Sequence, residues 1–404
     1  MVVSNTTRWP LPLELSQRNL SIWGKMLFVT LIAFVVACTL ATDWVIPNGD
    51  TPYYKSESHA IWGGAIPYRD VLIEYPPGVL PFILLAQPIG WLVGGYTAGF
   101  GIMTIIIITI LFRYIYELYG MDGVVISGLI LLPIAQYFFF DLDIFDAVAL
   151  FGALMMFTQK RFRLAAVLLA VSVLIKGYPV VCLPIFLLSL PRAKAIKFLK
   201  DFLLTVGAVL LPFILISPSG MWQSLSYHLG RPIEILSGAA TLGLWSGLFR
   251  KSTTIFSSHR SVSIAFPGSG VLSLAATLIL IVSLVWLTYW FYKLKTKPDI
   301  ALGCLIALLV FIIFFKVGSP QYIAPIWSVA ALVSIKLNSK ERYQLLSRLL
   351  ALGVATFLIS IELLNLIKLD GFAIFLDTVR YVLLFELLIW SIRKARATAS
   401  TKKI

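Results

Sequence analysis

The chain has 404 residues, of which 59% are hydrophobic and only 13% are charged. Soluble domains are about 45–50% apolar and about 25% charged, so this composition excludes a soluble enzyme, a disordered chain and a fibrous protein, and it indicates a protein solvated by a bilayer. The net charge of +14 fits basic cytoplasmic loops; nucleic acid is not an expected partner, because no basic stripe is interleaved with exposed aromatic residues.

The first long apolar run, residues 26–45, predicts a membrane-spanning helix. Small residues at 37–41 resemble a signal-peptide cleavage site. The run is long enough to cross the membrane and further runs follow it, so an uncleaved helix is favoured. Arg8, Arg18 and Lys25 precede the run, which predicts a cytoplasmic N-terminus.

Clusters of basic residues then recur along the chain, near residues 160, 195, 295, 340 and 395. If all of them face the cytoplasm, an even number of crossings separates each pair. The run 79–93 contains prolines and is interpreted as a broken segment rather than a full crossing. The remaining crossings are expected at 97–111, 122–139, 143–158, 201–217, 270–292, 300–316, 321–336, 349–366 and 372–391, with two short ones inside 164–191.

These runs predict an all-α fold, a polytopic transmembrane helical bundle of about twelve spans, to within one or two. Both termini are expected in the cytoplasm of a protein integral to the cell membrane. The whole chain, 1–404, is expected to form one membrane domain. Two large extracytoplasmic loops, 43–76 and 218–268, are expected to contain interfacial helices.

This topology gathers the unusual polar residues on the outer face. Asp50 follows a glycine in the first loop, where it serves either as a turn or cap residue or as a functional acid. Asp70 and Glu74 lie four residues apart and could share one face of a solvated interfacial helix. The next outer turn contains three carboxylates, more than a simple turn needs: Asp141, Asp143 and Asp146.

Basic residues also reach the outer face. Lys176 stands beside the helix break Gly177-Tyr178-Pro179, flanked by apolar residues. Its side chain either snorkels to the headgroups or binds an anion. The loop 218–268 has a net positive charge, which suits a lipid phosphate or pyrophosphate or serves to attract anionic lipid.

Taken in order, these motifs resemble the integral-membrane glycosyltransferases of the C superfamily that use polyprenyl-phosphate sugars, and glycosyltransferase family 87, the mannosyltransferase-like branch, fits best. The resemblance runs over most of the chain. Its most specific piece is the pair Tyr68-Arg69-Asp70 and Glu74-Tyr75-Pro76-Pro77. The weaker pieces are Gly49-Asp50 with Tyr53-Tyr54, Lys176-Gly177-Tyr178-Pro179, His228-Leu229-Gly230-Arg231-Pro232 and Ser319-Pro320-Gln321-Tyr322.

The resemblance implies that Asp50 is the catalytic base and that the donor phosphate binds near Lys176 and residues 228–231. Two departures exist: some members have histidines where Gln321 and Tyr322 stand, and many have a Gly-Gln pair at Asp141–Asp143. The substrate-binding residues expected from the motifs and the outer acids are Tyr54, Tyr68, Arg69, Asp70, Glu74, Asp141, Asp143, Lys176, Tyr178, His228, Arg231, Gln321 and Tyr322.

The expected chemistry is transfer of a hexose or pentose, with inversion, from a polyprenyl-phosphate-linked sugar donor to a lipid or glycan acceptor. One carboxylate takes the acceptor proton, and cations stabilise the leaving phosphate. No metal and no cofactor are expected. Two alternatives stay open: a secondary transporter for an anionic substrate, against which no inverted repeat is visible, and a lipid-linked glycan polymerase or ligase.

Overall fold

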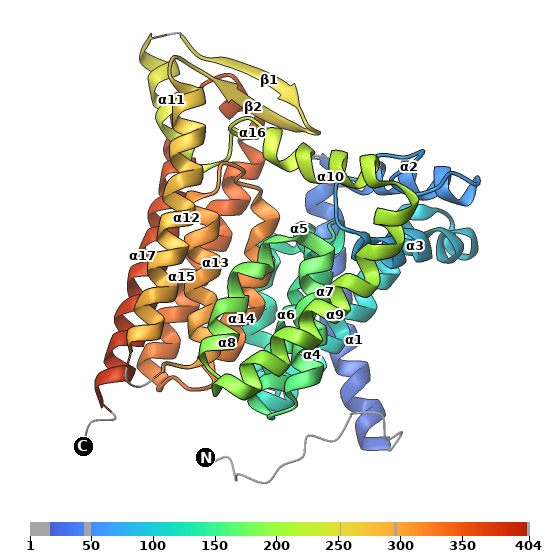
Figure 1. Cartoon of the computed structure of the whole chain (residues 1–404), viewed down its shortest axis with the longest axis vertical. Helices are drawn as coiled ribbons and strands as arrows, with labels where there is room; N and C mark the ends of the chain where they lie inside the picture. The colour runs from blue at the N-terminus through green and yellow to red at the C-terminus, as the bar shows by residue number, and fades with distance from the viewer. Residues whose placement is uncertain (1–16, 44–49, 251, 295–296, 402–404) are drawn as a thin grey trace.

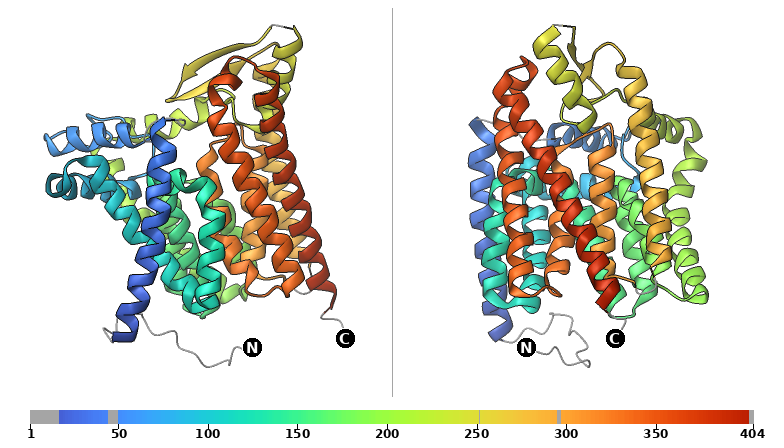
Figure 2. Two further views of the ribbon diagram at one scale, coloured as in Figure 1. Left: turned by 180° about the vertical axis from the view of Figure 1, so that it is seen from behind. Right: turned by 90° about the vertical axis from the view of Figure 1, so that its left-hand side faces the viewer.

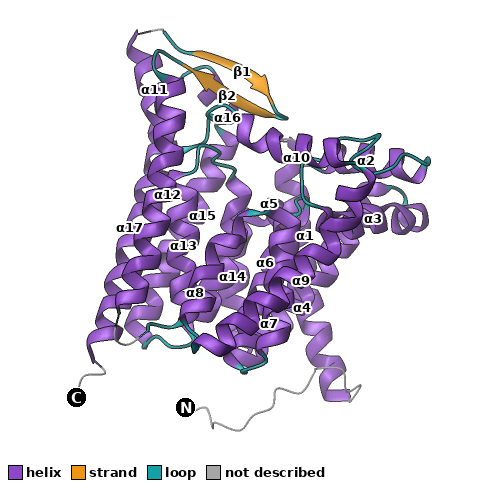
Figure 3. Cartoon of the chain, in the orientation of Figure 1, coloured by secondary structure: helices purple, strands orange, loops and turns teal. Residues whose placement is uncertain are grey.

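The computed structural model describes residues 17–43, 50–250, 252–294 and 297–401, and these are helical almost throughout (Figures 1 and 3). The helices are α1 (Gln17–Asp43), α2 (Thr51–Trp62), α3 (Leu80–Val93), α4 (Tyr96–Leu131), α5 (Ala135–Phe139), α6 (Asp143–Thr158), α7 (Phe162–Lys176), α8 (Leu183–Leu188), α9 (Arg192–Ile216), α10 (Pro218–Gly230), α11 (Gly238–Arg250), α12 (Ser269–Lys293), α13 (Ile300–Phe314), α14 (Ile323–Ser334), α15 (Ser339–Ile361), α16 (Leu363–Ile367) and α17 (Gly371–Thr401). Four short 3-10 helices join them: η1 (Pro77–Val79), η2 (Leu132–Ile134), η3 (Tyr178–Cys182) and η4 (Pro320–Tyr322).

The predicted class, a helical bundle rich in apolar helices, is confirmed. Within the described residues, five helical segments are long and apolar enough to cross a membrane. Two of them, α9 and α12, turn most of their apolar side chains outward, with only 6% and 17% of the most apolar window buried. The candidate spans are Leu20–Thr39, Tyr96–Phe139, Arg192–Ile216, Ser269–Lys293 and Ser339–Ile361.

The segment Tyr96–Phe139 is a helical hairpin rather than one long rod. Gly120 has φ 69° and ψ −164°, a conformation that interrupts α4 and that glycine adopts without steric cost. The hydroxyl of Thr104 donates a hydrogen bond to the carbonyl of Phe139, 3.2 Å away, so the two arms lie side by side. This agrees with the predicted separation of 97–111 from 122–139.

The centre of the bundle is α13, in which every side chain from Ile300 to Ile313 is buried. It packs against α12, α14 and α17, while α6 packs between α7 and α14. The start of α1 and the end of α17 lie at the same end of the bundle, the lower end in Figure 2. The apolar core thus surrounds one central helix.

The opposite, upper end carries the segments predicted as outer loops. Helices form in both loops, namely α2 in the first and α10 and α11 in the second, and α2 and α3 project together from the side of the bundle (Figure 1). The short α3 therefore does not run with the central helices, as its prolines indicate. Residues 44–49, part of the first predicted loop, lie outside the described residues.

An antiparallel hairpin, β1 (Thr254–Ser258) and β2 (Ser261–Ala265), stands above this end. The all-α prediction did not include it. The two turn residues, His259 and Arg260, have φ of 51° and 56°, the values of the tight turn that best suits a two-residue hairpin loop. Glycine or asparagine normally marks such a turn, so the sequence lacked the usual signal.

Candidate active site

A cavity of about 940 Å³ lies at the upper end of the bundle. Its lining comes from the first loop, the α5–α6 turn, the α7–η3 break, α9, α10, the hairpin and η4. The fold therefore brings segments that are far apart in the sequence to one cavity. The predicted site residues that line this cavity are Asp50, Glu74, Asp141, Lys176, Tyr178, His228, Arg231, Gln321 and Tyr322.

Asp50 stands at the N-cap of α2, but its carboxylate makes no capping hydrogen bond. Instead Oδ2 accepts hydrogen bonds from the hydroxyls of Tyr75 (3.1 Å) and Tyr54 (3.4 Å). Asp50 is therefore the cap residue by position, as one interpretation predicted, but its carboxylate is oriented by the two tyrosines rather than by the helix. The side chain lines the cavity, where it can reach a substrate.

The pKa of the Asp50 carboxyl group is raised above its ordinary value. Burial is the largest cause, the Lys176 ammonium opposes the shift, and the Glu74 carboxylate adds to it. A general base works best when its pKa approaches the working pH. The surroundings of Asp50 therefore make its carboxylate a stronger base than that of an exposed aspartate.

Lys176 is held by a buried ion pair. Its Nζ lies 3.0 Å from Oδ2 of Asp143, and the two side chains are only 4% and 0% exposed. The same ammonium stands 4.2 Å above the ring of Tyr75. Lys176 therefore points into the protein and does not snorkel. Asp143 does not line the cavity but holds the lysine that does.

The α10 end of the cavity contributes His228 and Arg231. The imidazole Nε2 of His228 lies 2.6 Å from the carbonyl oxygen of Glu74, so Nε2 must be the protonated nitrogen. Burial lowers the pKa of His228, which favours the neutral ring. Within the described part of the chain, the Arg231 guanidinium forms no hydrogen bond and no close ion pair, and its main favourable electrostatic partner is the buried Glu234 carboxylate. Its hydrogen-bond donors are available to an anion in the cavity.

Tyr178 and Tyr322 form an aromatic side of the cavity with Phe311. The ring centroids of Tyr178 and Phe311 are 5.3 Å apart in a stacked arrangement, and those of Tyr178 and Tyr322 are 5.0 Å apart. Gln321 lines the cavity next to Tyr322. The short helix η4 thus brings a polar amide and a ring to the site together.

Five of the predicted substrate-binding residues lie outside the cavity lining: Tyr54, Tyr68, Arg69, Asp70 and Asp143. Tyr54 orients Asp50, and buried Tyr68 donates a hydrogen bond to the carbonyl of Tyr75 (2.7 Å). Arg69 and Asp70 pair with each other at the surface, 2.9 Å apart and both exposed. These residues support the loop rather than face a substrate.

The expectation that Asp70 and Glu74 share a helix face is wrong. Residues 63–76 form turns with one isolated bridge between Pro67 and Val71. Asp70 accepts a hydrogen bond from the backbone N–H of Ile66 (2.8 Å), whereas Glu74 is buried and lines the cavity. Only the second acid is placed to meet a substrate.

The hairpin turn adds residues that the motifs did not indicate. Nη1 of Arg260 lies 2.6 Å from Oε1 of Glu57 on α2, and its guanidinium stacks over Tyr53 at 4.7 Å. Burial raises the pKa of Glu57 to about 7, although Arg260 opposes the shift. His259 packs against Tyr227 with centroids 4.8 Å apart. The tip of the hairpin therefore closes one side of the cavity.

One side of the cavity is apolar. It is lined by Leu210 and Ile214 of α9 and by Met221, Trp222 and Leu225 of α10. The same helix α9 turns its other apolar residues outward. The cavity therefore joins a polar region, around Asp50, to an apolar wall that adjoins the bundle surface.

Among the described residues, no group of three or more His, Cys, Asp and Glu side chains could hold a metal ion. No model of a known protein family matches the sequence, and a search of curated proteins also finds no match. A functional assignment therefore depends on the geometry and the chemistry of the cavity.

Proposed function

We propose that this protein is a membrane glycosyltransferase that moves a mannose-like hexose or a pentose from a polyprenyl-phosphate donor to a lipid or glycan acceptor. The observation that carries the proposal is the placement of Asp50, oriented by two tyrosine hydroxyls, in one large cavity with Lys176 and Arg231. The resemblance to family 87 supports the same assignment.

The proposed reaction is a single displacement. The Asp50 carboxylate takes the proton of the acceptor hydroxyl as its oxygen bonds to the anomeric carbon. The bond between that carbon and the phosphate oxygen breaks, and the phosphate leaves with the electron pair. Arg231 and Lys176 stabilise its growing negative charge. Attack from the face opposite the leaving group inverts the anomeric centre.

The apolar wall supports a lipid-linked donor. A polyprenyl chain needs apolar surface beside the polar reaction centre, and Leu210, Ile214 and Leu225 supply it. A phosphate at the junction would lie near headgroup depth, where basic side chains bind lipid phosphates. A soluble anionic substrate would not require this wall, which favours a transferase over a transporter of a small anion.

The proposal includes about twelve crossings with the cavity on the extracytoplasmic side. We expect reporter fusions at residue 404 and within 218–268 to report opposite sides of the membrane, with the C-terminal fusion in the cytoplasm. The basic clusters at the lower end are the physical reason. A cytoplasmic signal from the 218–268 fusion would contradict the proposed orientation.

Incubation with a radiolabelled polyprenyl-phosphate sugar tests the function itself. Transfer of the label to a lipid or glycan acceptor is the expected result. A transporter would move the donor without breaking the bond to the phosphate. A polymerase or ligase would transfer a preassembled glycan rather than a single sugar.

A further inference from the structure

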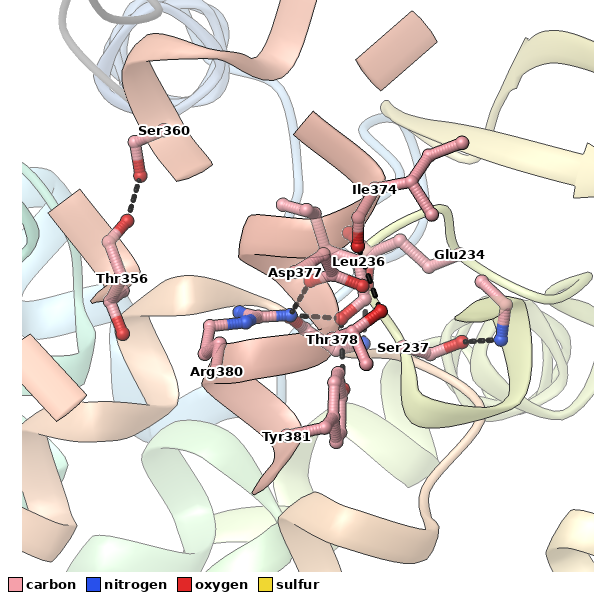
Figure 4. A network of polar contacts seen from close by, with 12 residues as sticks. Glu234, Leu236, Ser237, Thr356, Ser360, Ile374, Asp377, Thr378, Arg380 and Tyr381 are labelled. Atoms are coloured by element: carbon pink, nitrogen blue, oxygen red, sulfur yellow. Dashed lines mark hydrogen bonds and ion pairs between the residues drawn. The ribbon is translucent and has the colours of Figure 1, made fainter. Parts of the chain in front are cut away.

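A buried polar network on α17 contacts the backbone of Leu236, a residue that lines the cavity (Figure 4). Asp377 and Arg380 form an ion pair of 2.9 Å, and their side chains are 0% and 5% exposed. Neither residue lines the cavity. A buried ion pair is often no more stabilising than apolar residues of similar size, and ionisable residues inside membrane proteins are costly. The ion pair is therefore expected to do more than stabilise the packing of α17.

Arg380 joins two irregular segments of the chain. Its guanidinium donates hydrogen bonds to the carbonyl of Leu236 and to the carbonyl of Gly318, the second at 3.5 Å. Tyr381 donates a further hydrogen bond to the carbonyl of Leu236, 2.8 Å away. Buried non-helical backbone needs hydrogen-bond partners of this kind, and the planar arginine fork can serve two carbonyls at once.

The two segments are also bound directly to each other. The N–H of Gly318 donates to Oε2 of Glu234 (2.8 Å), and the N–H of Glu234 donates to the carbonyl of Lys316 (3.0 Å). A Cβ at Gly318 would lie 2.0 Å from the carbonyl oxygen of Leu236, so only glycine permits this approach. The segments 231–237 and 316–319 are therefore held together as one unit, and Arg380, which does not line the cavity, contacts both of them.

The front of that unit faces the cavity. Arg231 and Glu234, in the segment 231–237, line the cavity. Ser319, at the end of the segment 316–319, and Gln321 and Tyr322 of η4 also line it. The separation between the Arg231 guanidinium and the side chains of η4 is thus set by the direct bonds between the two segments together with the contact that Arg380 of α17 makes to both. A cation that must meet a phosphate needs a fixed position to be effective.

We propose that Arg380, held in place by Asp377, is a positioning residue that fixes Arg231 relative to η4 and so shapes the site for the donor phosphate. The substrate part of this inference rests on the proposed function. The structural part of the inference, that α17 couples the two backbone segments, does not rest on the proposed function. Arg380 acts through Arg231 and touches no reacting atom.

The test uses the full chain with the double variant Asp377→Leu/Arg380→Met, which removes both charges together and leaves no unpaired charge. A second variant, Arg380→Lys, keeps the charge beside Asp377 but cannot reach both carbonyls. The matched control is Arg348→Met/Glu386→Leu. It removes a 2.8 Å ion pair between α15 and α17 whose members do not line the cavity.

Hydrogen–deuterium exchange of the backbone amides tests whether Arg380 holds the two segments in place. We expect faster exchange at 231–237 and 316–322 in both Arg380 variants, unchanged exchange in α2 beside Asp50, and no such change in the control. The steady-state kinetics with the sugar donor test whether this positioning affects donor binding. We expect a rise of about tenfold in donor KM, as for one charge-assisted contact, with a smaller change in kcat.

Unchanged exchange at both segments in Arg380→Lys would overturn the inference. So would faster exchange combined with an unchanged donor KM. If the wild-type protein transfers no sugar, the proposed function fails, and binding of a polyprenyl phosphate replaces the kinetic readout. Binding about tenfold weaker in Arg380→Lys than in the control would then support the positioning role, and equal binding would overturn it. Thermal unfolding of each variant shows whether the protein is folded.

Discussion

Asp50→Asn is expected to reduce the rate of sugar transfer by about 10²–10⁴-fold, the usual contribution of a general base. Asparagine keeps the size of aspartate and can still accept the hydrogen bonds of Tyr54 and Tyr75. It cannot take a proton at the reaction pH. Because Asp50 makes no helix-capping hydrogen bond, its replacement has little reason to unfold the protein. The rate of label transfer in purified, folded protein is the measurement.

Two further variants define the outcome. Asp70→Asn is the matched control, because Asp70 is exposed, pairs with Arg69 and does not line the cavity, and we expect it to keep near wild-type activity. Asp141→Asn tests the neighbouring acid, whose Oδ1 lies 3.5 Å from the backbone nitrogen of Asp50. If Asp50→Asn retained more than about a tenth of the rate while Asp141→Asn lost it, Asp141 would be the base.

The second large effect is expected at Lys176. A lysine that only bound a phosphate could be replaced with more harm to donor use than to folding. The buried ion pair makes the loss of stability the larger effect, because loss of the ammonium leaves the Asp143 carboxylate buried without its partner. Removing one member of such a pair costs about 3–5 kcal/mol. We expect Lys176→Met to unfold at markedly lower temperature or denaturant concentration than the wild type.

A double variant separates stability from binding. Lys176→Met/Asp143→Asn removes both charges and keeps a polar group for the hydroxyl of Tyr178, which lies 3.5 Å from Oδ1 of Asp143. It should recover most of the stability that the single variant loses. If Lys176 also contacts the phosphate, the double variant should still bind the donor about ten- to a hundredfold more weakly. Full recovery of both properties would limit Lys176 to a structural role.

The sequence predicted that Asp50, Lys176 and Arg231 lie on one face of the protein, because charge sorts the loops of a membrane protein between its two sides. In the structure all three line one cavity, although they belong to distant segments. The rule carries no information on side-chain partners. The contact between Lys176 and Asp143 depends on how α6 packs against α7, and nothing local to either residue specifies it.

Other features were missed for identifiable reasons. The spacing of Asp70 and Glu74 indicates a shared face only if the segment is helical, and Tyr68 with φ 65° in a proline-containing turn prevents this. The hairpin turn at His259 and Arg260 lacks glycine and asparagine. Arg380 gave a usable signal, since an acid and a base three residues apart inside an apolar run are uncommon.

The most direct test of the central claim is the transfer of a single radiolabelled sugar in liposomes. The wild-type protein and Asp50→Asn are supplied with a polyprenyl-phosphate hexose and, separately, a pentose. The account predicts that the wild type moves label from one of these donors to a lipid or glycan acceptor with inverted anomeric configuration, and that Asp50→Asn does so at least about a hundredfold more slowly. Movement of the intact donor without transfer, or equal transfer by both proteins, would contradict it.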